Sequence, residues 1–478
     1  MTFENLIAGD WTTGQAVIVN QNPSDLSDTI GAYAVATDAQ VDDAVAAAKQ
    51  ALSGWAATSP QVRCDLLTKV ADRLDADRDA LGTLLAREEG KIRADGIAEV
   101  VRSAQFFRYF AGEAVRIGGY SGPSVRPGVE VTVQRRPIGV VGLICPWNFP
   151  IAIPAWKIAP ALAYGNTVVF KPSEWTPALG HALARILADC GVPAGVFNLV
   201  MGDGRVGARL TAHRDVAGVS FTGSAAVGRG VIAQAAARGA KVQAELGGKN
   251  PLVVLDDADL ANAVECAANG AFFQTGQRCT ASSRLIVTRG IVDAFTEALV
   301  ARVQGLPIGP ALAPDTMIGP VINEAQLEKN QRYVAIGRDE DGAQVALERH
   351  ADFNTPQGHY FGPVLFTDTH NAMRINREEI FGPVATIIPV ADYQEALAVA
   401  NDTEYGLSAG ICTRSMAAAR DFLQHSEAGI TVVNLPTAGV DYHIPFGGRK
   451  ASAYGAKEHG MAAHEFFTET RTGYVLPL

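Results

Sequence analysis

Val140-Val141-Gly142-Leu143-Ile144 is an uncharged, apolar run that predicts a strand buried on both faces. The same pattern returns in Thr167-Val168-Val169-Phe170, in Val196-Phe197-Asn198-Leu199-Val200 and in Gly218-Val219-Ser220-Phe221, and a helical pattern covers residues 178–190. Regular alternation of buried strands and helices is typical of a parallel sheet with helices on both faces. The sequence therefore predicts a doubly wound α/β fold.

A second alternating block begins at Pro251-Leu252-Val253-Val254-Leu255 and runs past residue 430, which predicts a second α/β lobe and an active site between the lobes. Much of the first hundred residues has the period of amphipathic helices. Two segments fit neither lobe: residues 118–136, which contain an alternating strand pattern, and the tail at 466–475. Strands remote from a core expose unpaired edges, so we expect another subunit to cover them.

Bulk composition limits the class of protein. The chain has 478 residues, of which 48% are hydrophobic and 19% charged, and its net charge is -10. These values predict a globular protein of more than one subdomain and argue against a nucleic-acid partner, which binds a basic face. The six cysteines form no C-x-x-C pair, which suggests neither a disulfide framework nor a metal site, and the N-terminus lacks a signal peptide pattern. We therefore expect a cytoplasmic protein without a membrane partner.

The strongest chemical signal is Cys279, in Gly276-Gln277-Arg278-Cys279-Thr280. A lone cysteine usually packs in a core, but here a glycine frees the backbone to turn, and the cation of Arg278 could favour a thiolate. We interpret Cys279 as a nucleophile for covalent catalysis on an electrophilic carbon. The nine histidines form no clear dyad with it.

Two glycine-containing turns compete as phosphate sites. Residues 202–207 match G-x-G-x-x-G between a strand and a helix, while Phe221-Thr222-Gly223-Ser224 ends a strand and offers free N–H groups and a hydroxyl. Pattern alone does not decide between them, since each is also an ordinary tight turn. Glu174, in Lys171-Pro172-Ser173-Glu174, is either an acceptor for ribose hydroxyls or a solvated loop charge.

Three further side chains lie in irregular, glycine- or proline-rich segments. Glu245, in Glu245-Leu246-Gly247-Gly248-Lys249, suits a general base or a capping carboxylate. Asn148, in Pro146-Trp147-Asn148-Phe149-Pro150, suits an oxyanion donor or an amide that satisfies its own turn. Glu378 and Glu379 precede a Gly-Pro turn, and because adjacent side chains point different ways, one acid holding a ligand hydroxyl is favoured over a glycosidase-like pair.

Taken in order along nearly the whole chain, these motifs and Pro445-Phe446-Gly447-Gly448 resemble those of the NAD(P)-dependent aldehyde dehydrogenase superfamily. Each motif is weak by itself, whereas the ordered set is very specific. The resemblance implies a Rossmann-like NAD(P)-binding domain of residues 1–117 and 138–244 and a catalytic domain of residues 245–460. It also implies that residues 118–137 and 461–478 are the oligomerisation element of a homodimer or homotetramer.

The resemblance supplies roles for the site residues. Cys279 would attack an aldehyde to give a thiohemiacetal, with its oxyanion held by Asn148 and the Cys279 N–H. Hydride transfer to the nicotinamide would leave a thioester, and Glu245 would activate the water that hydrolyses it. The implied cofactor contacts are Lys171 and Glu174 at the adenosine ribose, Gly223, Ser224 and Trp147 at the pyrophosphate, and Glu379 and Phe381 at the nicotinamide and its ribose.

Substrate class depends on two other stretches. Residues 434–443 and 277–284 resemble those of the 2-oxoglutarate semialdehyde (2,5-dioxopentanoate) dehydrogenases of pentose and sugar-acid breakdown. On this interpretation Arg278 pairs with the substrate carboxylate. Glu174 favours NAD because it would repel a 2′-phosphate, although NADP stays open. Succinate semialdehyde or another small aldehyde is the alternative substrate, and a cofactor-free cysteine hydrolase or acyltransferase is the alternative class.

Overall fold

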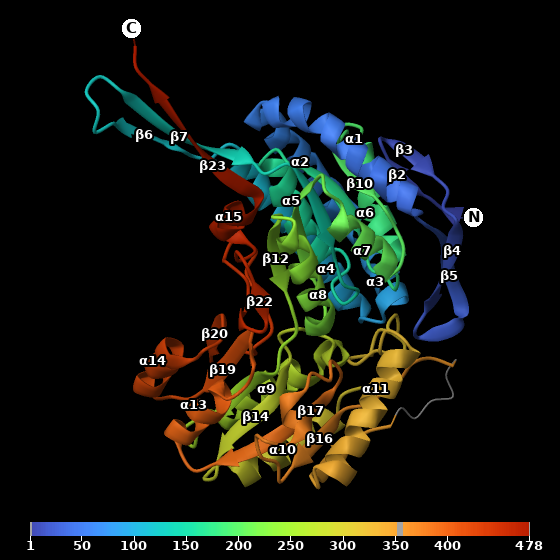
Figure 1. Cartoon of the computed structure of the whole chain (residues 1–478). Coiled ribbons are helices and arrows are strands. Elements are labelled where there is room, and N and C mark those ends of the chain that lie inside the picture. Colours follow the sequence, from blue (N-terminus) through green and yellow to red (C-terminus); the bar gives the residue numbers. More distant parts are fainter. Residues whose placement is uncertain (1, 351–356, 478) are drawn as a thin grey trace.

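Two sheets of mainly parallel strands form the centres of two lobes (Figure 1) in the computed structural model, which describes residues 2–350 and 357–477. In the first lobe the order is β22-β12-β11-β8-β9-β10-β2-β3. The five strands from β12 to β10 are parallel, and the others are antiparallel additions at the two edges. Their bounds are β2 (Asn5–Ile7), β3 (Asp10–Thr12), β8 (Val140–Ile144), β9 (Thr167–Lys171), β10 (Phe197–Leu199), β11 (Val216–Thr222), β12 (Lys241–Glu245) and β22 (Ala453–Tyr454).

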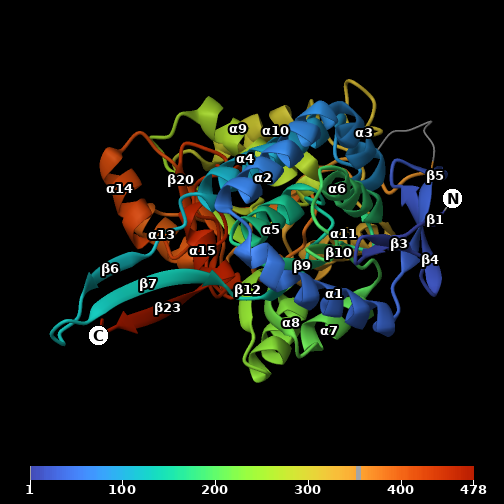
Figure 2. The same ribbon diagram turned by 90° about the horizontal axis from the view of Figure 1, so that it is seen from above.

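Helices cover both faces of this sheet, as Figure 2 shows from above, and the doubly wound prediction is confirmed. Every residue of β8 and β9 is buried, because apolar helix faces pack on either side. One face packs against α1 (Asp38–Ala57), α7 (Gly204–Ala212) and α8 (Ala225–Ala237). The other packs against α5 (Ala152–Ala163) and α6 (Pro177–Asp189), backed by α2 (Pro60–Ala76), α3 (Arg78–Glu89) and α4 (Arg93–Ala114).

The connection order places a crevice beside the central strand β8. From β8 the chain continues to β9 and β10 on one side, and it then returns to form β11 and β12 on the other. The loops that leave the carboxyl ends of β8 and β11 therefore run in opposite directions. In open α/β sheets such a switch point is where ligands bind.

The second lobe is built in the same way, with the order β15-β16-β17-β14-β13-β19-β20. All neighbours except the pair β15–β16 are parallel. One face packs against α9 (Leu260–Phe272) and α10 (Val292–Gln304), and the other against α13 (Tyr393–Asn401) and α14 (Met416–His425). The strand bounds are β13 (Asn250–Val254), β14 (Ser282–Thr288), β15 (Gln344–Glu348), β16 (Val364–Thr367), β17 (Val384–Val390), β19 (Ser408–Cys412) and β20 (Ile430–Val433).

A separate antiparallel sheet projects from the body at the upper left of Figure 1. It consists of β6 (Tyr120–Pro123), β7 (Glu130–Pro137) and β23 (Thr468–Val475), and β7 pairs with β23 along its full length. The two segments that fit neither lobe in the sequence thus pair with each other. Apolar side chains remain exposed on this arm, among them Tyr120, Val125 and Tyr474.

The amphipathic helices expected in the first hundred residues are confirmed as α1 to α4, whereas the strands that precede α1 were not expected. Residues before α1 form the sheet β1-β5-β4 and the edge strands β2 and β3, where β1 is Thr2–Phe3, β4 is Ala16–Asn22 and β5 is Asp25–Val35. Their burial does not alternate regularly, and β4 and β5 pair with shifts of register. Such strands lack the period-two pattern by which a strand is recognised.

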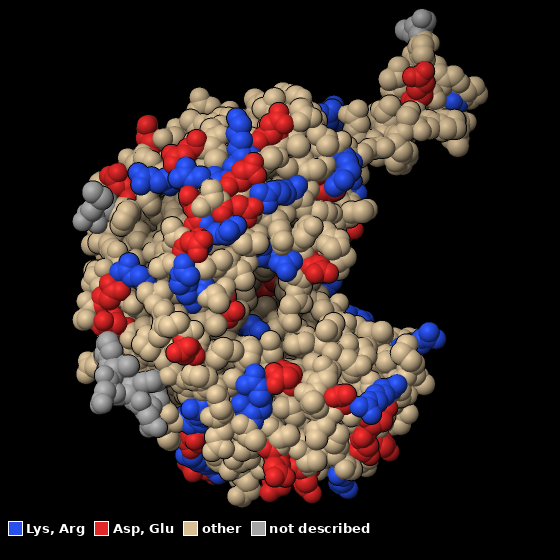
Figure 3. Space-filling model, turned by 180° about the vertical axis from the view of Figure 1, so that it is seen from behind, with Lys and Arg blue, Asp and Glu red and all other residues tan. Residues whose placement is uncertain are grey.

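The surface carries charges of both signs. Figure 3 shows acidic and basic side chains interspersed over the face turned away from the viewer of Figure 1, with a hollow between the lobes. Among the residues that the structure describes, no helix has both the length and the apolar character needed to cross a membrane.

Candidate active site

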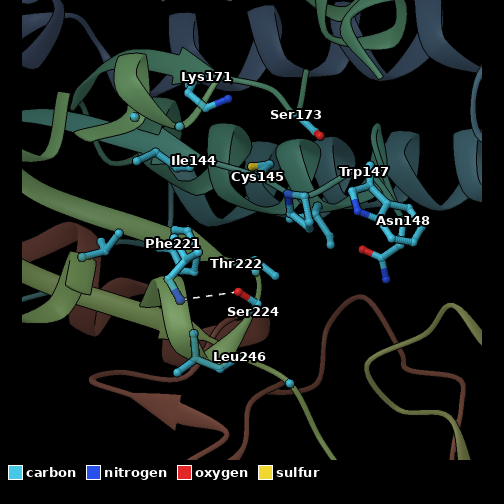
Figure 4. A pocket seen from close by; sticks show the side chains of 18 of the residues that line it. Ile144, Cys145, Trp147, Asn148, Lys171, Ser173, Phe221, Thr222, Ser224 and Leu246 are labelled. Atoms are coloured by element: carbon cyan, nitrogen blue, oxygen red, sulfur yellow. Dashed lines mark hydrogen bonds between the residues drawn. The ribbon is translucent and has the colours of Figure 1, made fainter. Parts of the chain in front are cut away.

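A cavity of about 970 Å³ occupies the switch point and extends to the second lobe. The first lobe lines it with residues that follow β8, β9 and β11, and Figure 4 shows Trp147 and Asn148 at one end and Lys171 farther along. The second lobe contributes residues that precede the amino ends of β13, β14 and β17. The structure brings together these predicted residues: Trp147, Asn148, Lys171, Glu174, Gly223, Ser224, Cys279, Glu379 and Phe381.

The end of β9 forms a charged corner of the cavity. The Lys171 ammonium is buried and donates to the carbonyls of Pro172 and Gly202, each at 2.7 Å. The Glu174 carboxylate lies 3.6 Å from it and is partly exposed to the cavity. Burial lowers the pKa of Lys171, and the neighbouring Glu174 opposes that shift. A carboxylate fixed in this way can accept hydrogen bonds from a diol.

Both glycine-containing turns lie on the cavity. Ser224 is the N-cap of α8, accepting from Val227 N–H at 3.4 Å, and it is exposed beside Gly223. In the other turn Asp203 is the N-cap of α7. Gly204 and Gly207 line the cavity there, near the Lys171 side chain. The amino end of α8 directs free N–H groups at the cavity, which suits an anion.

The opposite end is closed by an acid and two aromatic rings. The Glu379 carboxylate accepts a hydrogen bond from Gly248 N–H at 3.0 Å, and burial raises its pKa. Phe381 has a left-handed φ of 64° and meets the Trp147 ring edge-on at 5.5 Å. Sequence reasoning missed Gln326 and Lys329, which line the same end from α11 (Glu324–Ala335). That helix has the mixed composition of a surface helix, so no local signal marks them.

Cys279 follows a run of strained backbone. Gln274, Thr275 and Gly276 all have left-handed φ values, of 54°, 56° and 65°. At Gly276 a Cβ would overlap the backbone of Gly382, so only glycine fits. Such strain persists where the surrounding structure enforces it, commonly at functional sites. Here it presents the Cys279 thiol to the cavity.

The thiol is not activated by a cation in this conformation. Burial, reinforced by the charges of Glu245 and Glu379, raises the pKa of Cys279 to about 12. The backbone N–H groups of Thr280 and Cys279 act in the other direction, since they favour the thiolate. The Arg278 charge does interact with the Cys279 thiolate, but burial outweighs it in this geometry, so the expected stabilisation does not bring the pKa of the thiol to the neutral range.

The Arg278 side chain points into the second lobe and not into the cavity. Its guanidinium is buried and donates to the carbonyls of Asn269 and Gly270, the latter at 3.1 Å. Both carbonyls belong to the last turn of α9, where backbone acceptors lack partners within the helix. Because it caps that helix, Arg278 does not line the cavity, and its expected contact with a substrate carboxylate is not supported.

Asn148 is held close to the nucleophile. Its side-chain amide donates to the Gln277 carbonyl at 3.1 Å, and its own carbonyl accepts from Lys91 at 2.8 Å. Lys91 in turn forms a fully buried ion pair with Glu99 at 2.6 Å. The two loops that carry Asn148 and Cys279 are therefore tied together by a donor that an oxyanion could also use.

Glu245 lies at the end of β12, with its carboxylate directed at the turn of residues 447–448. It accepts from Gly448 N–H at 3.0 Å. Burial and then the negative charge of Glu458 raise its pKa well above the usual range. Glu458 is itself buried in an ion pair with Lys157. A carboxyl with a raised pKa beside a thiol is suited to proton transfer near neutral pH.

Comparisons with known proteins identify the family of this chain. The sequence matches the aldehyde dehydrogenase family over residues 11–473. It is 41% identical over 482 residues to an alpha-ketoglutaric semialdehyde dehydrogenase of Bacillus subtilis (strain 168), which covers 100% of this chain and 98% of the relative. It is 40% identical to an alpha-ketoglutarate semialdehyde dehydrogenase of Haloferax volcanii, with 98% of each covered. A solved betaine aldehyde dehydrogenase of Staphylococcus aureus in complex with NAD+ superposes with a TM-score of 0.96 at 32% identity, covering 99% of this chain and 94% of that one.

Proposed function

Since the chain belongs to the aldehyde dehydrogenase family, we propose that it oxidises 2-oxoglutarate semialdehyde (alpha-ketoglutarate semialdehyde) to 2-oxoglutarate, with NAD(P)+ as hydride acceptor. The observation that carries the proposal is the likeness over full length to two relatives of that name, at 41% and 40% identity. Every residue that the mechanism needs is present, and Cys279 and Asn148 share one cavity.

The cavity fits a nicotinamide dinucleotide. Its volume of about 970 Å³ is at the upper end for small-molecule sites. Its polar groups suit the parts of such a cofactor: Lys171 and Glu174 for the adenosine ribose, the amino end of α8 with Gly223 and Ser224 for the pyrophosphate, and Glu379 with Phe381 and Trp147 for the nicotinamide ribose and ring. Thr222 Oγ1 is buried in this wall without a partner among the described residues, so it offers one more polar contact. The bound cofactor would supply a hydride acceptor.

The chain's own residues perform the covalent steps. Cys279 Sγ gives its proton to Glu245, which passes it to solvent, and attacks the aldehyde carbon, while the oxygen takes the electron pair of the C=O bond. The Asn148 amide and the Cys279 N–H stabilise that oxyanion, a contribution worth roughly a hundred- to a thousand-fold in rate for one donor. When the C=O bond re-forms, hydride leaves the carbon for the NAD(P)+ that would be bound there, and a thioester remains on Cys279. Glu245, once released from Gly448, takes a proton from water, whose oxygen attacks the thioester carbon and expels the thiolate.

We propose roles for the remaining parts as well. Residues 1–117 and 138–244 form the cofactor domain, and residues 245–460 form the catalytic domain. The arm of β6, β7 and β23 joins subunits into a dimer or tetramer, because its exposed tyrosines and valines gain stability when covered. A cytoplasmic location fits six cysteines that are all free.

Reduced-cofactor formation tests the function directly. We expect absorbance at the NAD(P)H band with 2-oxoglutarate semialdehyde, measured with NAD+ and NADP+ in turn, and a lower kcat/KM with succinate semialdehyde. The proposal would be overturned if none of the aldehydes in a panel gave reduced cofactor. A preference for succinate semialdehyde would make that aldehyde the proposed substrate. Cys279→Ser should abolish oxidation, whereas Glu245→Gln should retain a burst of reduced cofactor and stall turnover. Steady turnover of Glu245→Gln would exclude Glu245 as the deacylation base.

A further inference from the structure

A substrate with a far carboxylate needs a cation on the side of Cys279 that the cofactor leaves free. Arg278 is held by α9, and Lys171 and Lys329 belong to the cofactor cavity. The question is which other cation has access to the substrate. The inference below rests on the proposed function, because only an aldehyde with a carboxylate requires such a cation.

One wall of the approach to Cys279 is helix α4. Glu99 on this helix accepts hydrogen bonds from Ile151 and Ala152 N–H, both at 3.1 Å, and binds Lys91, which holds the Asn148 carbonyl. This face of α4 is therefore fixed against the loop of the oxyanion donor. Arg102 is three residues after Glu99, so the two side chains project from the same face of the helix.

The other wall is the loop after β20, residues 434–443. Thr437 Oγ1 donates to the carbonyl of Thr280 at 2.7 Å, which anchors the loop at the residue next to the nucleophile. Farther along, Tyr442 packs against Tyr109 of α4 at 6.1 Å between ring centroids. The loop that is anchored next to Cys279 and the helix that is fixed against the Asn148 loop thus meet, with Tyr442 at their junction.

Arg102 lies at this junction, with its guanidinium 5.9 Å from the centre of the Tyr442 ring. The side chain is half-buried, and within the described residues no carboxylate lies in ion-pair distance of it. The other arginines of α4 differ: Arg93 binds Asp79, and Arg108 binds Asp72 and Asp75. A cation over an aromatic ring keeps its charge available for a second, anionic partner.

We propose that Arg102 binds the far carboxylate of the aldehyde substrate and that Tyr442 orients its guanidinium. The planar fork of an arginine matches a carboxylate in two parallel hydrogen bonds. Phe106 is four residues after Arg102, so it projects from the same face of α4, where it meets the Trp156 ring edge-on at 5.6 Å. Selectivity for carboxylated aldehydes then comes from α4 and the loop of residues 434–443, and not from the arginine beside the nucleophile.

The test compares Arg102→Met with wild type on two matched pairs: 2-oxoglutarate semialdehyde against pentanal, and succinate semialdehyde against butanal. We expect Arg102→Met to raise KM for the carboxylated member about 10- to 100-fold, the range for a lost charge-assisted hydrogen bond, with kcat and the alkanals little changed. Arg102→Lys should recover part of the loss. Arg108→Met removes a charge from the same helix outside the junction and should leave both pairs unchanged.

The outcomes separate the two proposals. If wild type shows no preference for the carboxylated member of either pair, the proposed function fails and no carboxylate needs a partner. If wild type prefers the carboxylated aldehydes and Arg102→Met keeps that preference, the function stands and Arg102 is not the binding residue. Equal losses on carboxylated aldehydes and alkanals would also overturn the proposal, since they indicate a general effect on the fold.

Discussion

Lys91→Met should weaken both the fold and the oxyanion site. Lys91 and Glu99 are almost fully buried, with 1% and 2% of their side chains exposed, and their charged atoms are 2.6 Å apart. Removal of one partner leaves the other charge buried without compensation, which typically costs about 3–5 kcal/mol. Two backbone hydrogen bonds to Glu99 survive, so we expect the lower end of that range, about 3 kcal/mol.

The catalytic effect follows from a second contact of the same ammonium group. Lys91 holds the Asn148 carbonyl at 2.8 Å, and loss of that bond frees the loop that aims the Asn148 amide. Complete loss of one oxyanion donor costs roughly a hundred- to a thousand-fold in kcat, so a donor that is only misplaced should cost less. KM should change less than kcat, because the oxyanion exists only after attack.

Thermal denaturation and steady-state kinetics measure the two effects. Lys49→Met is the matched control, because Lys49 forms an ion pair of 2.7 Å with Asp215 on the surface, with 61% of its side chain exposed. Such a pair contributes about 0–1 kcal/mol. The double variant Lys91→Met/Glu99→Gln should regain stability, since Glu99 is then no longer a buried charge without a partner. Equal effects of Lys91→Met and Lys49→Met on stability, with kcat intact, would refute the reasoning.

Three further predictions address the cavity. Gly276→Ala should lower kcat and stability, by about 1–3 kcal/mol for the strained backbone, and a variant with wild-type melting and rates would show that the turn relaxes freely. Glu458→Gln removes a negative charge that raises the pKa of Glu245, so that pKa should fall and the acidic limb of the pH–kcat profile should move to lower pH. An unmoved limb would show that the charge of Glu458 does not influence the titration of Glu245 during turnover. Glu174→Gln should lower the KM for NADP+ relative to NAD+ in steady-state assays, and an unchanged ratio would mean that Glu174 does not face the 2′ position.

The fold was predictable where burial is complete. The runs that became β8, β9 and β13 are apolar on both faces, so their sequences differ from any surface segment. The strands before α1 were missed because their polar and glycine residues sit at sheet edges with irregular burial. The pairing of β7 with β23 joins residues far apart in sequence, and no local pattern predicts such a contact.

The site was predictable only through its turns. Glycine and proline mark the segments around Asn148, Gly223, Cys279 and Glu379, and all four line the cavity. No motif marks the segments that carry Lys329, Glu458 and Lys91. A charged residue in such a segment is expected to lie on the surface. Their roles arise from packing between elements, which the sequence does not display locally.

Arg278 shows why adjacency in sequence is weak evidence for shared chemistry. The left-handed backbone of residues 274–276 turns Cys279 to the cavity and leaves its neighbour facing the end of α9. There the guanidinium donates to carbonyls that have no partner within the helix. Burial lowers the pKa of Arg278 to about 10. A cation fixed in this way interacts with the Cys279 thiolate, but burial of the sulfur outweighs that attraction. Since burial raises the pKa of Cys279 to about 12, its proton must leave through a change in surroundings, such as movement of Glu245 away from Gly448 toward the sulfur. The chemistry of this cysteine therefore depends on groups distant in sequence.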